Sequence, residues 1–493
     1  MKQILIIIVL IFPLLGFSQF SQIGQDIDGE AFGDQSGYSV SLSADGNRVA
    51  VGAQLNDGNG SEAGHVKIYE VVNGSWVQLG SNINGEATLD FSGWSVSLNS
   101  DGNCVAIGAR YNDGGVFNSG HVRVYQYDNN DWVQLGQDID GEAVEDQSGY
   151  SVSLSANGNR VAIGAPFNDN GGVNAGNVRI FELVNNAWQQ LGSSINGEVA
   201  TDRSGWSISL SDNGNRVAIG ARYNAGGSSF AGHVRVFEFN NSGWVQIGQD
   251  IDGEAIDDFS GHSVSLNADG SRVIIGAYVN DGNGFGSGHA RVFEFDNNNW
   301  SQLGQDIDGE AINDWSGWSV SINDIGNRIA IGARYNDGSI ANSGHVRIYE
   351  FEQGQWDQLG QDIDGEAFFD SQSGYSVSLD GAGNRVAIGS HLNDGVAANA
   401  GHVRVYEFNS SPLSNDDFDL ETVALYPNPT QDYFILKGLS ENIEFVKIYD
   451  IHGRLIEDYK SSSRYKVSDF SKGLYFVQIF TDKRKRYSKL IIH

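Results

Sequence analysis

The sequence predicts an all-β fold, a seven-bladed β-propeller of four-stranded blades followed by a small C-terminal β-sandwich. Three observations lead to this prediction. One unit recurs every 56 residues, each unit holds four short strand-like segments, and no helical periodicity occurs. The clearest markers of the period are Trp76, Trp132, Trp188, Trp244, Trp300 and Trp356.

The third copy illustrates the strands of one unit. Ser151-Val-Ser-Leu154 alternates apolar and polar residues, as a half-buried strand does. Asn157-Gly158 is typical of a tight hairpin turn and leads into a second strand over 160–164. Third and fourth strands are expected over 177–182 and 188–191. Four consecutive antiparallel strands favour a propeller blade.

The two ends of the repeat region predict closure of the ring. The first three strands occur seven times, whereas the tryptophan strand follows the third strand only six times. A seventh version of it, Phe20-Ser-Gln-Ile-Gly24, lies near the N-terminus and aligns with Trp76-Val-Gln-Leu-Gly80. We therefore expect the N-terminus to supply the outer strand of the last blade, which removes an open sheet edge.

Within each unit, three segments resemble a known repeat. Ser36-Gly-Tyr-Ser-Val-Ser-Leu42, Arg48-Val-Ala-Val-Gly-Ala53 and Gly64-His-Val-Lys-Ile-Tyr69 resemble an FG-GAP repeat, the blade of integrin α-subunit propellers, with Ser-Gly in place of Phe-Gly. The resemblance covers roughly residues 20–408. It implies the propeller fold and leaves function open, because one fold hosts many activities.

Charge narrows the classes of partner. The formal net charge is −32. Between residues 3 and 412, 17 Lys and Arg stand against 50 Asp and Glu, a net charge of −33. Such a surface disfavours nucleic acid and anionic membranes. The single cysteine, Cys104, excludes an intramolecular disulfide and takes a repeat position that other copies fill with arginine.

The N-terminus resembles an export signal. Residues 1–18 form the expected signal peptide, with Lys2 followed by the apolar stretch 4–15 and small residues for cleavage before Gln19. No other segment is apolar enough for a membrane helix, so no membrane span is expected after cleavage. The mature protein is expected to be secreted or held at the outer cell surface.

Composition and period change after Asn409. We expect a propeller over 19–409, a linker over 410–421 and a second domain over 422–493. Ala424-Leu-Tyr-Pro-Asn-Pro-Thr430, Ile448-Tyr-Asp450 and Gly473-Leu-Tyr-Phe-Val477 closely resemble the type A C-terminal sorting domain of the type IX secretion system. The resemblance implies a bacterium of the Bacteroidota type, the type IX machinery as partner, and passage through the outer membrane.

Carboxylates recur in the loop before each first strand. In the first copy they are Asp26, Asp28, Glu30 and Asp34, a weak candidate for Ca²⁺, which prefers several oxygen ligands. The alternative, which recurrence in every blade favours, is that they cap turns or bond backbone N–H groups. No cofactor is predicted, and Ca²⁺ is the only ion considered. The recurring pairs are Glu30/Asp34, Glu86/Asp90, Glu142/Asp146, Glu198/Asp202, Glu254/Asp258, Glu310/Asp314 and Glu366/Asp370.

Two further residue types recur once per blade. Six Gly-His steps are interpreted as structural, because histidines in separate blades are too far apart to share a metal; they are His65, His121, His233, His289, His345 and His402. Rings at the start of the first strand either pack between blades or stack on a ligand near the axis. These are Tyr38, Trp94, Tyr150, Trp206, His262, Trp318 and Tyr375.

The copies differ most in the loops before strand one and between strands two and three. Alternate turns of a meander fall on one face, so both loops should share it. Arginine and tyrosine are favoured at binding hot spots. The candidate ligand-binding residues are Arg110, Tyr111, Arg222, Tyr223, Arg334 and Tyr335, with Phe91, Phe259 and Trp315 expected as exposed aromatics.

No sequence motif for catalysis is found: there is no P-loop, no Gly-x-Ser-x-Gly and no His-Glu-x-x-His. The predicted function is non-catalytic binding or adhesion to a glycan or protein at the cell surface. One alternative is a polysaccharide-active enzyme with its site on the loop face. The other is a structural component of the surface layer.

Overall fold

The computed structural model describes residues 19–226, 228–338, 340–366, 371–409, 424–437, 443–450, 454–481 and 485–493. The expected signal peptide of residues 1–18 and the linker of residues 410–421 lie outside the described residues. The chain divides into two compact units, Met1–Ser410 and Ser411–His493. Throughout the described ranges the regular structure is strand, and no helix there could cross a membrane.

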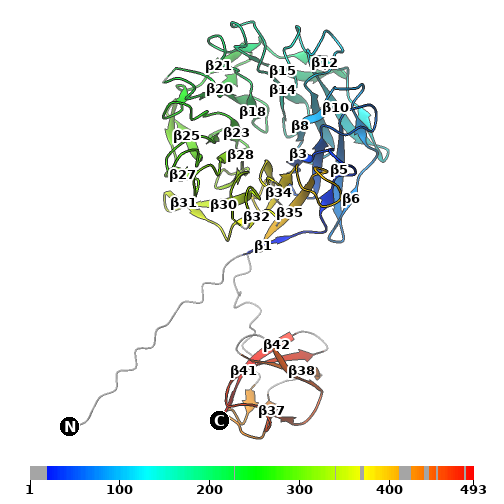
Figure 1. Ribbon diagram of the computed structural model, residues 1–493, viewed down its shortest axis with the longest axis vertical. Coiled ribbons are helices and arrows are strands. Elements are labelled where there is room, and N and C mark those ends of the chain that lie inside the picture. The colour runs from blue at the N-terminus through cyan, green and yellow to red at the C-terminus, as the bar shows by residue number, and fades with distance from the viewer. Residues whose placement is uncertain are drawn as a thin grey trace, which may run out of the picture. The chain divides into compact units, whose positions relative to one another are not determined.

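The first unit is a propeller of seven antiparallel sheets arranged around an axis, which confirms the expected fold (Figure 1). In blade 1 the strands pair in the order β3-β4-β5-β6, and the short β7 lies beside β5. Their bounds are β3 (Ser36–Leu42), β4 (Arg48–Ala53), β5 (His65–Val72), β6 (Ser75–Gln78) and β7 (Ile83–Asn84).

Blades 2 to 4 repeat this order. Blade 2 holds β8 (Ser92–Leu98), β9 (Cys104–Ala109), β10 (His121–Asp128), β11 (Asp131–Gln134) and β12 (Ile139–Asp140). Blade 3 holds β13 (Ser151–Leu154), β14 (Arg160–Ala165), β15 (Asn177–Val184), β16 (Ala187–Gln190) and β17 (Ile195–Asn196). Blade 4 holds β18 (Ser207–Leu210), β19 (Arg216–Ala221), β20 (His233–Phe239), β21 (Trp244–Gln246) and β22 (Ile251–Asp252).

Blades 5 and 6 follow the same plan. Blade 5 holds β23 (Ser263–Leu266), β24 (Arg272–Ala277), β25 (His289–Asp296), β26 (Asn299–Gln302) and β27 (Ile307–Asp308). Blade 6 holds β28 (Ser316–Ile322), β29 (Arg328–Ala333), β30 (His345–Glu352), β31 (Gln355–Gln358) and β32 (Ile363–Asp364).

Blade 7 joins the two ends of the repeat region. It combines β33 (Ser376–Leu379), β34 (Arg385–Ser390) and β35 (His402–Asn409) with β1 (Gln19–Gln22) and β2 (Ile27–Asp28) from the N-terminus. β1 runs antiparallel to β35 and places Phe20 opposite Phe408. The predicted closure is therefore confirmed. Pairing with β1 covers the edge of β35, which would otherwise be unpaired in blade 7.

The Ser/Val alternation of the first strand follows from contacts between blades. While its apolar residues are buried, Ser39 Oγ donates a hydrogen bond of 2.8 Å to Gly93 O of the next blade. Ser41 Oγ accepts one of 2.9 Å from Leu98 N. Blades approach so closely here that a Cβ on Gly52 would lie 2.2 Å from Gly93 O, so glycine is required in the second strand.

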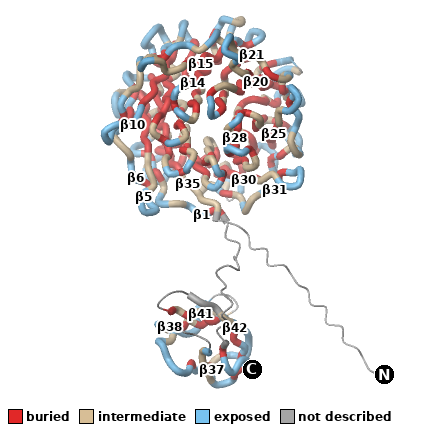
Figure 2. The backbone as a smooth tube through the Cα atoms, turned by 180° about the vertical axis from the view of Figure 1, so that it is seen from behind, coloured by how far each residue is buried: buried red, intermediate tan, exposed pale blue. Residues whose placement is uncertain are grey.

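The recurring tryptophans join neighbouring blades in the same way. Trp132 of blade 2 is buried and donates its indole N–H to Leu79 O of blade 1 at 2.8 Å. Equivalent bonds link Trp76 to Ile23, Trp188 to Leu135, Trp244 to Leu191, Trp300 to Ile247 and Trp356 to Leu303. Because apolar clusters combine residues of two adjacent blades, one blade cannot form its core alone. Figure 2 shows the buried residues of the propeller in red.

The second unit is a small β-sandwich, as expected. One sheet is β36-β37-β40, and the other is β39-β38-β41-β42. Phe434 and Tyr465 from the first sheet and Val446, Ile479 and Leu490 from the second form one buried core. The strands are β36 (Ala424–Tyr426), β37 (Tyr433–Lys437), β38 (Ile443–Tyr449), β39 (Leu455–Lys460), β40 (Tyr465–Lys466), β41 (Gly473–Thr481) and β42 (Lys485–Ile492).

Candidate functional site

Seven side chains, one from the start of each first strand, form a closed cycle around the propeller axis, which we call the collar. Their consecutive ring centroids lie 4.3 to 6.2 Å apart. All but His262 remain half-buried, so solvent reaches them. The contacts fit packing between blades, and the accessibility leaves the rings available to a ligand. The collar comprises Tyr38, Trp94, Tyr150, Trp206, His262, Trp318 and Tyr375.

A second tier lies against the collar, made by the residue that directly follows the second strand of each blade. Five of its side chains, those of arginine, tyrosine and histidine, contact the collar residue of their own blade and that of the next blade. His391, for example, stacks 3.8 Å from Tyr375 and 5.7 Å from Tyr38. The second tier comprises Gln54, Arg110, Pro166, Arg222, Tyr278, Arg334 and His391. Unlike the collar, it mixes cationic, polar and apolar side chains.

Alternate blades carry the same three-residue arrangement. The guanidinium of Arg110 lies 3.3 Å from the ring centroid of Trp94 and 4.3 Å from that of Tyr111. In blade 4, Arg222 lies 3.4 Å from Trp206 and 4.6 Å from Tyr223. In blade 6, Arg334 lies 3.6 Å from Trp318 and 4.4 Å from Tyr335. Each guanidinium thus offers mainly its edge for hydrogen bonding.

The loop before the first strand adds three aromatics to this face. Phe91 lies 5.2 Å from Tyr111, Phe259 lies 5.4 Å from Tyr223, and Trp315 lies 4.6 Å from Tyr335, measured between ring centroids. The two loops therefore share one face, as expected. The prediction that Phe91, Phe259 and Trp315 are exposed is wrong, because packing against the tyrosines leaves them half-buried.

These three aromatics also have an unusual backbone conformation. Phe91, Phe259 and Trp315 have positive φ angles of 56°, 55° and 58°. Bulky residues rarely adopt this region, and the same position in blade 4 places Arg203 at 54°. The turn holds these side chains toward the residues that directly follow the second tier: Arg203 lies 4.7 Å from the Phe167 ring and 4.5 Å from the Tyr223 ring. We call this tier, the collar and these loops the axial face.

Ion pairing separates the axial face from the rest of the propeller. Of the propeller's 17 lysines and arginines, 13 pair with an Asp or Glu within the described ranges. The four that have no acidic partner among the described residues all lie on the axial face: Arg110, Arg203, Arg222 and Arg334. A strongly acidic domain thus leaves four guanidiniums without carboxylates in one place.

Five buried polar atoms of the second tier have no hydrogen-bond partner among the described residues. They are the Nε atoms of Arg110, Arg222 and Arg334, one end of the Gln54 amide and His391 Nδ1. Twelve further atoms of this kind, mostly serine hydroxyls and nitrogens of histidine and arginine, lie elsewhere in the described propeller. A buried donor left unpaired costs roughly 1–3 kcal/mol. At the second tier such atoms lie beside guanidiniums that have no acidic partner, and a ligand there would complete their hydrogen bonding.

Burial governs the titratable groups of the axial face. It raises the pKa of Tyr38 well above its usual value, with Tyr375 and Tyr150 adding to the effect. Burial, with a smaller contribution from Arg334, lowers the pKa of His391 to about 3. The pKa of His262 falls well below its usual value for the same reason, with Arg222 and Arg334 contributing. These histidines are neutral near pH 7, so the arginines carry the positive charge.

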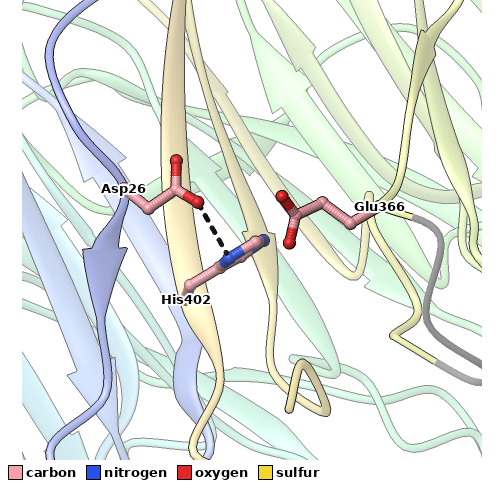
Figure 3. Close-up of side chains that lie close together, drawn as sticks. All are labelled: Asp26, Glu366 and His402. Carbon is pink, nitrogen blue, oxygen red and sulfur yellow. Dashed lines mark ion pairs between the residues drawn. The ribbon is translucent and has the colours of Figure 1, made fainter. Parts of the chain in front are cut away.

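The recurring histidines form a second kind of cluster, away from the axis. Figure 3 shows His402 between Asp26 and Glu366, with His402 Nδ1 3.7 Å from Asp26 Oδ2. Both carboxylates also pair with Arg404, and the Asp26 contact is 3.0 Å. Similar clusters recur in four other blades. In each cluster an arginine pairs with the glutamate, which supports the structural interpretation of these histidines.

The four weak Ca²⁺ candidates of the first copy have separate partners. Asp26 contacts Arg404, whereas Glu30 pairs with Lys67. Asp34 accepts hydrogen bonds of 3.0 Å from Ala31 N and Asn56 Nδ2. Like-charged Asp26 and burial raise the pKa of Asp28. The structure therefore does not gather the four carboxylates into one ligand set.

The recurring acids fall into two roles. The aspartates cap their own loops, as expected: Asp146, for example, accepts from Ala143 N at 2.9 Å. The glutamates differ from this expectation, because each pairs with the arginine or lysine two residues after the Gly-His or Gly-Asn step. The pairs are Glu30–Lys67, Glu86–Arg123, Glu142–Arg179, Glu198–Arg235, Glu254–Arg291, Glu310–Arg347 and Glu366–Arg404. Asp370 lies outside the described residues.

The axial face brings together all nine candidate ligand-binding residues named from the sequence. It also includes Gln54, His391 and Arg203, which sequence reasoning did not single out as binding residues. One signal could have indicated the arrangement: the first strand starts with tryptophan only in the blades where Arg-Tyr follows the second strand. That coincidence reflects the stacking of each arginine on its tryptophan.

Comparison with solved structures finds similarity at low sequence identity. The chain is similar to a Bacteroides uniformis structure described as a 6-phosphogluconolactonase, with 14% identity, 69% of this chain and 88% of that chain covered, and a TM-score of 0.48. The WD40 repeats of RRP9 give 12% identity, coverage of 79% and 100%, and a TM-score of 0.46. Hydrazine synthase of Kuenenia stuttgartiensis gives 11%, 76% and 96%, and 0.45.

One curated relative matches a short part of the chain. Ulvan lyase NLR42 of Nonlabens ulvanivorans is 28% identical over 93 residues, which is 18% of this chain. The chain spans only 17% of that relative's length in the match. A match of this length cannot include the whole of the seven-bladed unit.

The second unit gives the most specific comparison. Residues 424–493 match the family model described as "Secretion system C-terminal sorting domain". The matched range includes every strand of the small β-sandwich, from β36 to β42. This match confirms the expected sorting domain and implies export with an extracellular or surface-attached destination. Residues 424–493 therefore belong to the C-terminal sorting domains of the type IX secretion system.

Proposed function

We propose that the propeller is a non-catalytic binding module that captures a glycan or protein ligand outside the cell or at its surface. One observation carries the proposal: the four arginines without an acidic partner lie together with half-buried aromatics on the axial face. Arginine, tyrosine and tryptophan are the residues most enriched at binding hot spots. The remaining, repeated contacts serve the blades themselves.

The titration behaviour of the axial face supports binding rather than catalysis. General acid–base catalysis is most effective when the pKa of the catalytic group lies near the working pH. Here burial raises the pKa of Tyr38 and Tyr375 and lowers that of His391 to about 3. The tyrosines are therefore weak acids and His391 a weak base near pH 7, and each can still form hydrogen bonds to a ligand.

The proposal extends to how the chain is built and delivered. The blades are proposed to be FG-GAP-like, and adhesion is one form that the proposed binding takes. Residues 1–18 are proposed as the signal peptide, 19–409 as the propeller, 410–421 as the linker and 422–493 as the sorting domain. The type IX machinery is the proposed partner for export, and the mature protein is proposed to be secreted or displayed at the cell surface.

A labelled preparation of the purified chain on glycan and protein arrays tests the binding role. We expect retention of specific ligands without any product, and loss of retention when Arg110 is replaced by glutamine. Release of new reducing ends or unsaturated products from a polysaccharide panel would replace this proposal with a polysaccharide-active enzyme. Absence of any ligand, with a deletion strain defective only in surface integrity, would replace it with a structural component.

Export is tested by deleting residues 413–493 in the native host. We expect the truncated propeller to accumulate in the periplasm, because the part recognised by the secretion machinery is gone. Immunodetection on intact and fractionated cells measures this. Undiminished surface display of the truncated chain would contradict the proposed route.

A further inference from the structure

We propose that the axial face binds an acidic sugar unit, one that carries a carboxylate or sulfate ester on a hydroxylated ring. Arg110 and Arg334 bind its anionic group in this proposal. The inference rests on the binding function proposed above and specifies the chemistry of the ligand. It follows from where unpaired charge, unpaired hydrogen-bonding atoms and aromatic surface coincide.

The charge balance of the propeller indicates that the ligand carries a negative charge. Acidic residues outnumber basic ones 50 to 17 between residues 3 and 412, so nearby carboxylates are abundant. Thirteen of the basic residues use them within the described ranges, yet Arg110, Arg222 and Arg334 do not. A guanidinium binds carboxylate and sulfate through a planar fork of N–H donors, and stacking on tryptophan fixes the direction of that fork. An anionic ligand supplies the missing partner.

The three arginines act on a common region. Arg110 lies 5.6 Å from the ring centroid of Tyr150, the collar residue of the next blade. Arg222 lies 3.0 Å from His262 Nδ1, and Arg334 lies 5.4 Å from the ring centroid of Tyr375. Each guanidinium thus reaches the collar residue of the next blade as well as that of its own. One compact ligand can therefore meet more than one of them.

The free donors are unevenly distributed around the axis. Arg222 is bonded at both terminal nitrogens, to His262 Nδ1 at 3.0 Å and to Tyr223 Oη at 2.9 Å. Arg334 donates from Nη2 to Tyr335 Oη at 2.9 Å and has no second protein partner among the described residues. Arg110 has no hydrogen-bonding partner in those parts of the chain. Among these three stacked arginines, those of blades 6 and 2 therefore have the most available donors.

Blades 7 and 1, between those two arginines, supply neutral groups. His391 Nδ1 and one end of the Gln54 amide are buried without a partner. The rings of Tyr38 and Tyr375 lie 4.9 Å apart between their centroids. A similar unpartnered amide oxygen, of Gln147, lies in blade 3. Neutral donors and acceptors of this kind suit sugar hydroxyls, and half-buried rings beside them suit the apolar face of a sugar.

The surrounding charge limits the length of the ligand. A net charge of −33 over the repeat region repels a polyanion laid across the blades. Local positive charge at the axis attracts one anionic group at a time. The site therefore fits a single acidic unit or the end of a chain better than a continuous run of acidic sugars.

Calorimetric titration of the purified full chain tests this at low ionic strength. The probes are D-glucuronate, D-glucose 6-sulfate and D-glucose. We expect at least one acidic sugar to bind at least tenfold more tightly than glucose, since a hydrogen bond to a charged group contributes about 1.5–3 kcal/mol. Arg110→Gln and Arg334→Gln should each weaken that binding about tenfold or more, and Arg222→Gln should weaken it less.

A matched control and the contrary outcomes complete the test. Arg160→Gln removes the same charge from a position paired with Glu182 and should leave the affinity within about twofold. Circular dichroism verifies that each variant is folded.

The acidic sugar that binds more tightly identifies the anionic group as carboxylate or sulfate. Equal binding of glucose, unchanged affinity in Arg110→Gln, or no binding of either acidic sugar would overturn the inference. In each of those cases a neutral glycan or protein retained on the arrays would leave the wider binding function standing.

Discussion

Arginine occurs both at the boundaries between blades and on the axial face, but its side chain has different partners in the two regions. Arg160 pairs with Glu182 at 2.8 Å and donates across the blade boundary to Gly214 O at 3.2 Å. Arg110 stacks on Trp94 and has neither an acidic nor a hydrogen-bonding partner among the described residues. The first arrangement recurs in six blades and satisfies itself, whereas the second occurs in three blades and leaves donors unused. Residues that satisfy one another hold the propeller together, and residues that do not are available to a ligand.

The tryptophans at the blade boundaries should give the largest effect. Trp188→Ala removes a buried ring and its hydrogen bond to Leu135 O, and we expect the free energy of unfolding to fall by about 3–5 kcal/mol. Denaturant titration followed by tryptophan fluorescence and circular dichroism measures it. If the division between scaffold and site is right, ligand affinity of the folded fraction stays unchanged.

Trp188→Phe is the matched control for that experiment. Phe20 occupies the equivalent place in blade 7, so a benzene ring fits there. The substitution keeps most of the apolar burial and leaves Leu135 O without its donor, for a loss of about 1–2 kcal/mol. A loss as large as that of the alanine variant would mean that the hydrogen bond, rather than ring packing, dominates the boundary.

Acid should weaken the scaffold through its histidines. Burial lowers the pKa of His121 to about 4, with Arg123 adding to the effect, against an ordinary value near 6.5. The folded state therefore binds its proton less readily than the unfolded state, so stability is full above pH 6.5 and falls as the pH drops toward 4. At pH 5.5 this one group should cost about 1 kcal/mol relative to pH 7.5.

His121→Asn isolates that contribution, because Asn177 fills the same position in blade 3. We expect the variant to lose less stability than the parent chain between pH 7.5 and pH 5.5. Unfolding curves at both pH values measure the difference. An identical pH dependence in both chains would show that carboxylates, and not His121, govern the acid limb.

Paired and unpaired arginines allow a direct comparison with one substitution. Arg160→Gln breaks a partly exposed ion pair and hydrogen bonds to the next blade, and should destabilise by about 1 kcal/mol after solvent screening. Arg334→Gln loses cation–π stacking of about 0.5–1 kcal/mol and removes a buried unpaired donor, so the net change should be near zero. Thermal unfolding of both variants checks this. A larger loss for Arg334→Gln would assign that residue to the scaffold.

Much of the fold could be predicted because it is repeated. The strand order follows from periodicity, and the closing strand follows from the alignment of Phe20 with the tryptophans. Arg110, Arg222 and Arg334 could be named because they interrupt the repeat. Gln54 and His391 could not, since each occurs once at its position and only their buried, unpartnered atoms distinguish them. Whether a buried polar atom has a hydrogen-bond partner depends on the side chains of neighbouring blades. The spacing of residues in the sequence does not predict this.

The smallest expected effect tests whether a repeated contact can be restored where one blade lacks it. In six blades an arginine of the second strand faces a glutamate of the third, as Arg48 faces Glu70, but in blade 2 Cys104 faces Gln126. Burial raises the pKa of Cys104 to about 11, so its thiol stays protonated and forms no ion pair. The double change Cys104→Arg with Gln126→Glu should add about 0.5–1 kcal/mol of stability, and each single change should add less. A double-mutant cycle from unfolding curves measures the coupling, and additive single effects would show that these pairs contribute no mutual stabilisation at a blade boundary. A stabilising interaction energy between residues 104 and 126, with none between Arg110 and Arg334, would support a simple division. Positions that are the same in all blades would then form the scaffold, and positions that differ between blades would form the binding site.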